Sequence, residues 1–156
     1  MNFARRWASI ALRPCAYASP AMLPSSMFAV NIHFLGGCNM LCSYCFHSNP
    51  SLRGATPFGP TLSPEECIQG IDRLVSAGAT KLNFAGGEPF LYPSRLLGMA
   101  SYARARGLYT SVITNGLLAE PNDAFDMLGV SVDFFDDATN NRIGRSACLL
   151  HRPAVQ

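Results

Sequence analysis

The 156 residues, of which 49% are hydrophobic, are enough for one domain with a buried core. A formal net charge of +2 and a charged-residue content of 14% exclude both the basic surface of a nucleic-acid-binding protein and the polarity of a disordered chain. Because no run of about 18 consecutive apolar residues occurs, the sequence predicts no membrane-spanning helix.

Residues 1–26 have the composition of a leader. Arginines stand among alanines and serines, and no acidic residue precedes Glu65. This pattern is typical of a mitochondrial targeting sequence. Two alternatives stay open: a poorly ordered leader, and a helix at a membrane surface, since apolar side chains lie among the arginines. We expect the folded domain to occupy residues 27–145 and an irregular tail to follow over residues 146–156.

The first half of the domain is predicted to contain one strand and one helix. Alternating apolar and polar residues predict a strand over residues 28–35, which leads through two glycines into a loop with three cysteines. Three prolines and two glycines predict irregular structure over residues 49–60. Ser63 is a suitable N-cap for a helix that begins at Pro64, has two glutamates in its first turn and ends at Gly78.

The second half is predicted to alternate between strands and helices. The expected elements are strand 81–85, helix 93–106, strand 108–114, a short helical stretch over 123–128 and strand 129–133. This alternation is typical of parallel βα units in an α/β fold. In such folds the functional groups gather at the carboxyl ends of the strands.

The cysteine pattern carries the strongest chemical signal. Cys38, Cys42 and Cys45 follow the spacing Cys-x3-Cys-x2-Cys, whereas the other cysteines are scattered, so a disulfide framework fits poorly. A zinc site usually takes four ligands in two separated pairs. A [4Fe-4S] cluster on a three-cysteine loop keeps one iron open. We therefore predict such a cluster in a reducing compartment, the cytoplasm or the mitochondrion, with a zinc knuckle or ordinary buried thiols as the alternative.

The same spacing, with the aromatic Tyr44 directly before Cys45, resembles the signature of radical S-adenosylmethionine (SAM) enzymes. The resemblance implies that the open iron binds the amino and carboxylate groups of SAM. It also implies that an electron from the cluster splits SAM and gives a 5′-deoxyadenosyl radical, while the protein positions the reactants.

A second motif, Gly86-Gly87-Glu88-Pro89, directly follows the predicted strand 81–85. It resembles the family segment that presents backbone oxygens to the SAM amino group, and its alternative is a tight turn. Polar residues at the ends of the next two strands reach the SAM ribose or carboxylate in this interpretation, and turn chemistry is their alternative. The SAM contacts implied are Tyr44, Phe46, Gly86, Gly87, Glu88, Pro89, Thr114, Asn115, Ser131 and Arg145.

Between residues 30 and 145 the chain is similar to the viperin-like branch of these enzymes. The similar segments are 31–34, 45–47, 81–84 and 143–145. The resemblance implies a partial parallel (βα) barrel with about four βα units present. It implies conversion of CTP to 3′-deoxy-3′,4′-didehydro-CTP in antiviral defence. The implied partners are an electron donor such as a flavodoxin or ferredoxin system and the iron–sulfur assembly machinery, without direct nucleic-acid binding.

Strand alternation supports a substrate surface, because alternate side chains share one face of a strand. Asn31 lies on the same face as His33, and Lys81 on the same face as Asn83. The apolar residues between them would then face the helices. The resemblance implies that Asn31, Lys81 and Asn83 bind the nucleoside triphosphate, and Lys81 is the sole lysine of the chain. A solvated lysine on a strand edge is the alternative.

Three features depart from the viperin-like pattern. Residues 48–60 form a longer, proline-rich segment, Phe134 replaces a small polar residue beside Asp133, and residues 146–156 contain no further βα unit. Two alternatives follow: a radical SAM enzyme with another substrate, and an inactive truncated fragment that acts only through interactions. The open edge of the fourth strand would favour such an interaction.

Overall fold

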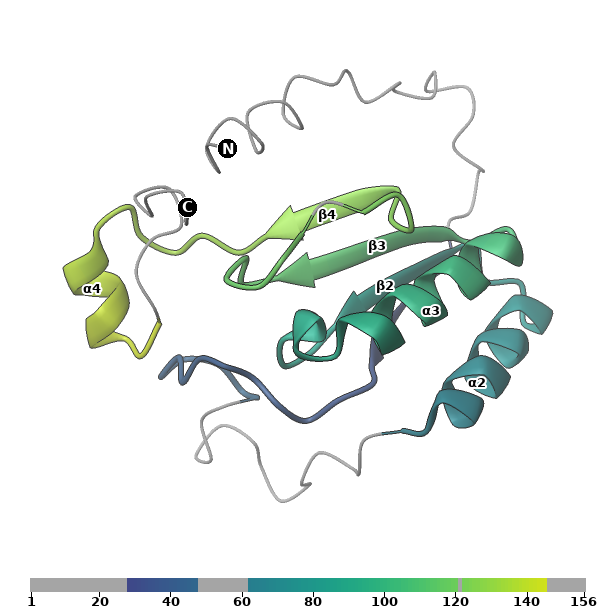
Figure 1. Ribbon diagram of the computed structural model, residues 1–156, viewed down its shortest axis with the longest axis horizontal. Coiled ribbons are helices and arrows are strands. Elements are labelled where there is room, and N and C mark those ends of the chain that lie inside the picture. Colours follow the sequence, from purple (N-terminus) through teal and green to yellow (C-terminus); the bar gives the residue numbers. More distant parts are fainter. Residues whose placement is uncertain (1–27, 48–61, 121, 146–156) are drawn as a thin grey trace.

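The computed structural model describes residues 28–47, 62–120 and 122–145 (Figure 1). The predicted leader (1–26), the proline-rich segment (48–60) and the tail (146–156) lie outside the described residues. Within the described part of the chain, no helix combines the length and apolar character needed to cross a membrane.

The central element is a four-stranded parallel sheet in which the strands lie side by side in chain order. Its strands are β1 (Ala29–His33), β2 (Lys81–Ala85), β3 (Tyr109–Thr114) and β4 (Met127–Val130). Since all strands run in one direction, their carboxyl ends meet at one edge of the sheet (Figure 1). The cysteine loop and the segment around α4 lie at this edge. The arrangement confirms the predicted parallel α/β architecture.

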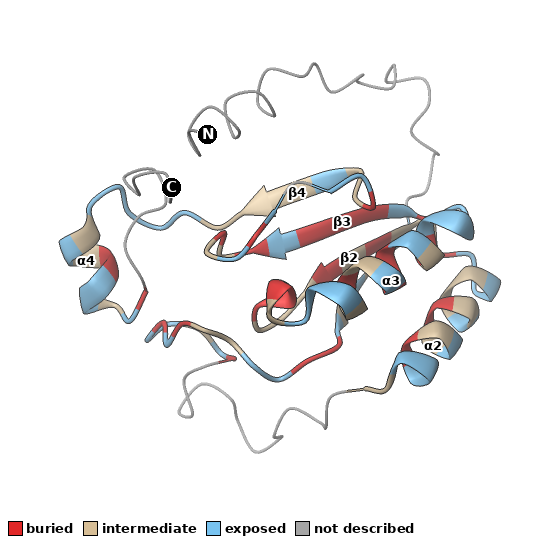
Figure 2. Cartoon of the chain, in the orientation of Figure 1, coloured by how far each residue is buried: buried red, intermediate tan, exposed pale blue. Residues whose placement is uncertain are grey.

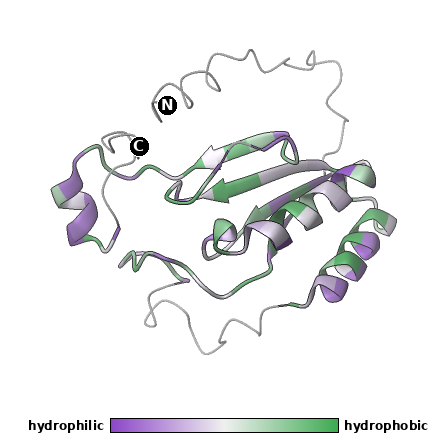
Figure 3. Cartoon of the chain, viewed as in Figure 1, coloured by the Kyte–Doolittle hydropathy of each residue, from purple (hydrophilic) through white to green (hydrophobic). Residues whose placement is uncertain are grey.

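Two long helices connect the first three strands. They are α2 (Pro64–Ser76), between β1 and β2, and α3 (Pro93–Ala105), between β2 and β3. A short 3-10 helix, η2 (Pro89–Leu91), precedes α3, and α4 (Asp137–Arg142) follows β4. The sequence analysis located α2 and α3 to within about two residues at each end. It did not anticipate η2 or α4, which are short and, in the case of α4, hydrophilic over most of its length (Figure 3).

The predicted start of α2 is confirmed in detail. The Ser63 hydroxyl accepts a hydrogen bond from the Glu66 backbone N–H (3.1 Å), and the Glu66 carboxylate accepts one from the Ser63 N–H (2.6 Å). This reciprocal capping box satisfies two N–H groups that have no partner within the helix. At the other end, Gly78 adopts a φ of 87°, a conformation that ends the helix without side-chain strain.

One face of the sheet forms the hydrophobic core. Leu82, Phe84 and Val112 are fully buried and pack with apolar residues of α2 and α3 in one cluster, so that β3 is buried over most of its length (Figure 2). The Phe34 and Phe84 rings meet edge to face, with centroids 6.3 Å apart. These contacts confirm that the apolar residues of β1 and β2 face the helices, which leaves the opposite face for polar side chains.

The predicted helix over residues 123–128 is wrong. Strand β4 begins at Met127, two residues before the predicted start, and ends at Val130. The Asp126 N–H already donates to the Thr110 carbonyl (2.9 Å), and the Asp126 carboxylate accepts from the Thr110 N–H (2.7 Å). Phe125 packs edge to face on Phe84 at 6.1 Å. Pairing with β3 and this aromatic contact therefore override the helical pattern, and residues 115–120 and 122–126 contain no helix.

We predict that Ser63→Ala lowers the free energy of unfolding by about 1 kcal/mol, because it removes one half of the capping box. Urea denaturation followed by circular dichroism measures this change. Ser101→Ala, at an exposed position inside α3, is the matched control and should leave the unfolding midpoint unchanged or slightly raised. Equal midpoints for Ser63→Ala and the unaltered protein would contradict the prediction.

Candidate functional site

The cysteine loop, defined as residues 36–47, follows β1 and lies at the carboxyl edge of the sheet (Figure 1). Cys42 is buried, and Cys38 and Cys45 are partly buried. All of them carry thiols rather than disulfides, as the cluster prediction requires. The three sulfur-bearing residues are therefore held on one loop with their side chains partly withdrawn from solvent.

The pKa of the Cys38 thiol reports on its neighbours. Burial raises this pKa most, and the negative charges of Glu88, Cys42 and Cys45 raise it further, against the opposite effect of the Met40 backbone N–H. The other two cysteines therefore lie close enough for their charges to act on Cys38. Three adjacent thiolates repel one another, so a bound cation stabilises them together.

The Gly-Gly-Glu-Pro segment holds the first half of the cysteine loop. The Glu88 N–H donates to the Gly37 carbonyl at 2.9 Å. Gly87 has a φ of 57°, and a Cβ there would lie 2.0 Å from the same carbonyl oxygen. At Gly86, with a φ of 80°, a Cβ would lie 2.1 Å from His33 Nδ1. Gly87 thus permits a close approach to the backbone of the cysteine loop, and Gly86 makes room for the His33 side chain.

Glu88 ties the ends of β2 and β3 together from inside the protein. Its side chain is fully buried and accepts hydrogen bonds from Thr114 Oγ1 (2.7 Å), the Asn115 N–H (2.8 Å) and the Phe90 N–H (3.0 Å). Asn115 extends the connection, because its side-chain amide donates to Asn39 Oδ1 at 2.7 Å in the cysteine loop. Glu88 and Thr114, predicted to contact SAM, therefore have a structural role in the fold, next to the buried Pro89.

The segment after α4 holds the second half of the loop. The Leu41 N–H donates to the Gly144 carbonyl (2.9 Å), and the Ser43 N–H donates to the Ile143 carbonyl (2.8 Å). Gly144 has a φ of 79°, and a Cβ there would lie 2.2 Å from the Leu41 carbonyl oxygen. The sequence analysis noted residues 143–145 only for their resemblance to the family, and it did not predict the contact of Gly144 with the loop, because that contact joins segments about 100 residues apart.

Three polar side chains and one backbone carbonyl meet beside this contact. The Tyr44 hydroxyl donates to Asp133 Oδ2 at 2.6 Å, and Arg145 pairs with the same oxygen at 2.6 Å. Arg145 also donates to the Ser131 carbonyl oxygen. Burial, the hydrogen bond to Asp133 and the neighbouring Cys42 raise the pKa of the Tyr44 phenol, so it stays protonated and acts as a donor. Tyr44, Ser131 and Arg145, all predicted SAM contacts, are thus brought together.

The polar face of the sheet, defined as the face that carries Asn31, Asn83 and Ser111, lies opposite α2 and α3. The Asn83 side-chain amide donates to Asn31 Oδ1 (2.9 Å), and the Ser111 hydroxyl donates to Asn83 Oδ1 (2.9 Å). Lys81 lies on the same face, two residues before Asn83 and nearer the amino end of β2. Its ammonium group is 5.3 Å from the centre of the Tyr109 ring. Since β2 is an inner strand, the strand-edge alternative for Lys81 is wrong.

The sequence analysis did not identify Ser111 as a residue of the polar face. Side-chain alternation along β3 and its register with β2 would have placed Ser111 beside Asn83 on that face. It pairs with Asn83 across β2 and β3. At the carboxyl end of the same face, the rings of His33 and Phe46 lie 6.3 Å apart. Phe46, a predicted SAM contact, is therefore near the point where the polar face reaches the cysteine loop.

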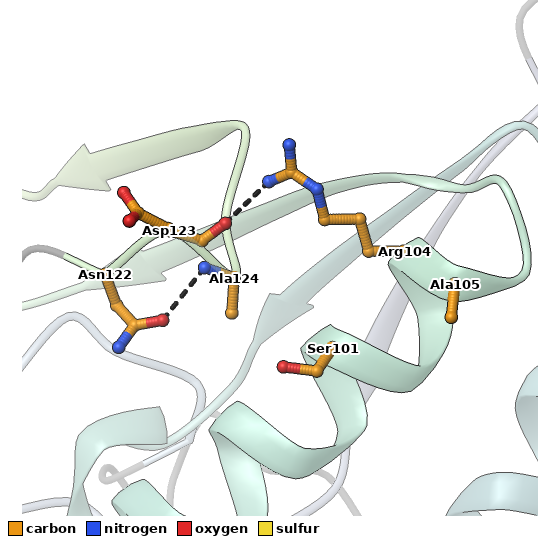
Figure 4. A pocket seen from close by; sticks show the side chains of 6 residues that line it. All are labelled: Ser101, Arg104, Ala105, Asn122, Asp123 and Ala124. Atoms are coloured by element: carbon orange, nitrogen blue, oxygen red, sulfur yellow. Dashed lines mark hydrogen bonds between the residues drawn. The ribbon is translucent and has the colours of Figure 1, made fainter.

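A pocket elsewhere in the fold includes none of the predicted site residues. It lies between the C-terminal part of α3 and the connection before β4 (Figure 4), and its lining residues are Ser101, Arg104, Ala105, Asn122, Asp123 and Ala124. The Arg104 guanidinium donates to the Asp123 carbonyl (2.6 Å) and pairs with Asp126 (3.2 Å). We interpret this pocket as the junction of two elements, held by contacts within the protein.

The donor set suits a cluster better than a single metal ion. Among the described residues, no three His, Cys, Asp or Glu side chains are placed to share one ion. In an iron–sulfur cluster each thiolate binds its own iron, so the sulfur atoms need not converge on one point. Three free thiols on one loop are a donor set that fits the predicted cluster.

Fold and site together define a parallel α/β protein with a three-cysteine loop across the carboxyl ends of its strands. The chain belongs to the radical SAM superfamily, whose sequence profile matches residues 32–149. The cofactors predicted from the sequence, a [4Fe-4S] cluster and SAM, are those of this superfamily.

Several relatives are SAM-dependent nucleotide dehydratases. The chain is 37% identical over 136 residues to "S-adenosylmethionine-dependent nucleotide dehydratase RSAD2" of Siniperca chuatsi, and the aligned segment covers 81% of this chain and 36% of that protein. It is 31% identical over 128 residues to "S-adenosylmethionine-dependent nucleotide dehydratase" of Lacinutrix mariniflava, and the aligned segment covers 78% of this chain and 27% of that protein. These matches confirm the viperin-like resemblance, and the chain spans about a third of these relatives' length.

Solved structures support the fold. The crystal structure of Streptococcus suis SuiB bound to precursor peptide SuiA superposes with a TM-score of 0.59 and 16% identity, over 76% of this chain and 27% of that chain. SuiB bound to S-adenosylmethionine gives a TM-score of 0.58 and 14% identity, over 76% and 28%. At such identities the likeness concerns the fold alone, and it confirms the predicted partial barrel.

We predict that Glu88→Gln destabilises the protein by about 2 kcal/mol, because a side-chain amide cannot accept all the hydrogen bonds that the buried carboxylate accepts. Chemical denaturation measures the change. Glu120→Gln, at an exposed position, is the control and should stay within about 0.5 kcal/mol of the unaltered protein. If the Glu88→Gln protein is as stable as the control, the hydrogen bonds of the Glu88 carboxylate do not stabilise the fold as we describe.

We predict that alkylation of Cys38 by iodoacetamide in the metal-free protein rises with pH around a midpoint above the ordinary value of 9.0. The thiolate is the reacting form, and a raised pKa lowers its fraction at any given pH. Mass spectrometry of the Cys38 peptide after timed alkylation gives the profile, with urea-unfolded protein as the reference. A folded-state midpoint at or below that of the unfolded protein would contradict the assigned environment.

Proposed function

We propose that this chain is the SAM-binding part of a nucleotide dehydratase that converts CTP to 3′-deoxy-3′,4′-didehydro-CTP. A hydrogen atom is abstracted from the ribose, and a hydroxyl group leaves as water with an electron and a proton, so that the nucleotide loses one water in total. Because the chain spans 36% of the Siniperca chuatsi relative, activity, substrate and partners are proposals. The observation that carries them is the polar face, where the row Asn31–Asn83–Ser111 and Lys81 lie below the cysteine loop.

The row on the polar face suits recognition of a polar ligand. Asn83 donates to Asn31 and accepts from Ser111, so both ends of its amide are oriented by neighbours. Such fixed donors and acceptors bind a ligand with little further loss of side-chain freedom. Lys81 adds the positive charge that a triphosphate requires, and its ammonium group lies over the Tyr109 ring. The ribose would then lie between this cation and the cysteine loop.

When bound, the cluster and SAM supply a 5′-deoxyadenosyl radical that takes a hydrogen atom from the substrate. Cys38, Cys42 and Cys45 would hold the cluster. The backbone at Gly86 and Gly87 would accept the SAM amino group, and the Arg145 guanidinium would attract its carboxylate. The remaining proposed SAM contacts are Tyr44, Phe46, Glu88, Pro89, Thr114, Asn115 and Ser131.

Partners and location follow from the same chemistry. Reductive cleavage of SAM needs a one-electron donor, and we propose a flavodoxin or ferredoxin system, with the iron–sulfur assembly machinery as the source of the cluster. Three thiolates that must stay reduced favour the cytoplasm or the mitochondrion.

The decisive experiment incubates the anaerobically reconstituted, reduced protein with SAM and each of the four ribonucleoside triphosphates. We expect 5′-deoxyadenosine to form with CTP well above the level with the other nucleotides, and a CTP product lighter by one water. Mass spectrometry measures both. Release with a different nucleotide, or equal release with all of them, would favour a radical SAM enzyme with another substrate. An iron-loaded protein without any SAM cleavage would favour the inactive fragment.

We predict that Lys81→Gln raises the KM for CTP about tenfold, since it removes one phosphate-binding charge, while SAM cleavage without nucleotide keeps its rate. Arg106→Gln, on the helix side of the sheet, is the charge-matched control. Initial-rate measurements over a range of CTP concentrations test the difference. If both variants change KM equally, Lys81 acts through net charge and not through a contact with the triphosphate.

A further inference from the structure

The cysteine loop has a second support that the cofactor contacts do not account for. Its first half is held by the Glu88–Gly37 hydrogen bond after β2. Its second half is held from the other end of the chain, by residues 143–145 and Asp133. We call these residues the brace. They belong to the segment after β4.

The backbone contacts of the brace surround one cysteine. Leu41 and Ser43 donate their N–H groups to Gly144 and Ile143, and Cys42 is the residue between them. Cys42 is buried, with 8% of its surface exposed. The backbone position of Cys42 is therefore set by a segment that lies about 100 residues later in the chain.

Asp133 connects the brace to the rest of the loop. A single oxygen, Asp133 Oδ2, accepts from the Tyr44 hydroxyl and from the Arg145 guanidinium, at 2.6 Å each. Tyr44 stands between Cys42 and Cys45 in the sequence, so this contact fixes the stretch that carries both cysteines. Hydrogen bonds to a carboxylate are stronger than those between neutral groups, and the same oxygen also pairs with the Arg145 guanidinium.

Arg145 anchors Asp133 in turn. Its side chain is 8% exposed, whereas that of Asp133 is 28% exposed. Besides the ion pair, Arg145 donates to the Ser131 carbonyl at the end of β4. The end of β4 therefore contacts Arg145, Arg145 contacts Asp133, and Asp133 contacts Tyr44 of the cysteine loop.

We propose that Asp133 is a positioning residue for the iron–sulfur cluster, which it serves by holding Tyr44 and Arg145 so that Cys42 and Cys45 are prearranged to bind iron. This inference rests on the iron–sulfur cluster of the proposed function, and it adds a role for a residue outside the cysteine loop. Retention of the cluster then depends on the segment after β4 as well as on the cysteine loop. Loss of Asp133 loosens the second half of the loop and leaves the first half on its Glu88 contact.

Hydrogen exchange in the metal-free protein tests the brace without any cofactor. In Asp133→Asn and in Tyr44→Phe, amides of residues 41–45 should exchange about tenfold faster, because local opening no longer breaks a charge-assisted hydrogen bond. Amides of β2 and β3 should keep their rates. Asp123→Asn, at an exposed position away from the loop, is the matched control. Unchanged exchange at 41–45, or equal acceleration in the strands, overturns the proposal.

Iron retention tests the link to the cluster. After anaerobic reconstitution, transfer of iron to a chelator should be about tenfold faster for Asp133→Asn than for the unaltered protein or Asp123→Asn. The double variant Tyr44→Phe, Asp133→Asn should lose iron no faster than the faster single variant, since both changes break one connection. Equal retention in Asp133→Asn, or additive effects in the double variant, overturns the proposal. Neither measurement involves CTP, so an error in the proposed substrate leaves this test intact.

Discussion

The close approach of the cysteine loop to the loop after β2 is the contact on which the rest of the site depends. The Glu88 N–H reaches the Gly37 carbonyl at 2.9 Å, and a Cβ at Gly87 would lie 2.0 Å from that oxygen. Any side chain at this position would separate the two loops. Because the Glu88 carboxylate also holds Asn115, and Asn115 reaches Asn39, the same approach joins the ends of β1, β2 and β3.

The sheet places the cofactor residues and the polar face at a fixed separation. The Asn31–Asn83 pair lies two residues before the carboxyl end of its strands, about 7 Å below the His33–Ala85 pair at a strand rise of 3.3 Å per residue. A ligand on the polar face and one at the cysteine loop are therefore neighbours. In the proposed function, this separation would bring the sugar of a bound nucleotide close to the SAM-derived group, as hydrogen abstraction requires.

Local signals in the sequence predicted most of the described elements. Ser63, Pro64 and Gly78 mark the ends of α2 because capping and chain reversal depend on nearby residues. The prediction failed at residues 123–128, where Phe125 is used to fill the core against Phe84. The failure has a physical cause: a helical pattern of few residues is weaker than pairing with an existing strand.

By itself the sequence determined the three-cysteine loop, the glycine segment, the sharing of one strand face by Asn31 and Asn83, and hence the family, since each depends on spacing within one short segment. Only the tertiary structure decided that Ser111 completes the polar row, that Glu88 is a buried tie and that Asp133 joins Tyr44 to the end of β4. These contacts join residues 26 to 89 positions apart. No local pattern records such pairs, because packing of the sheet brings them together only after the chain has folded.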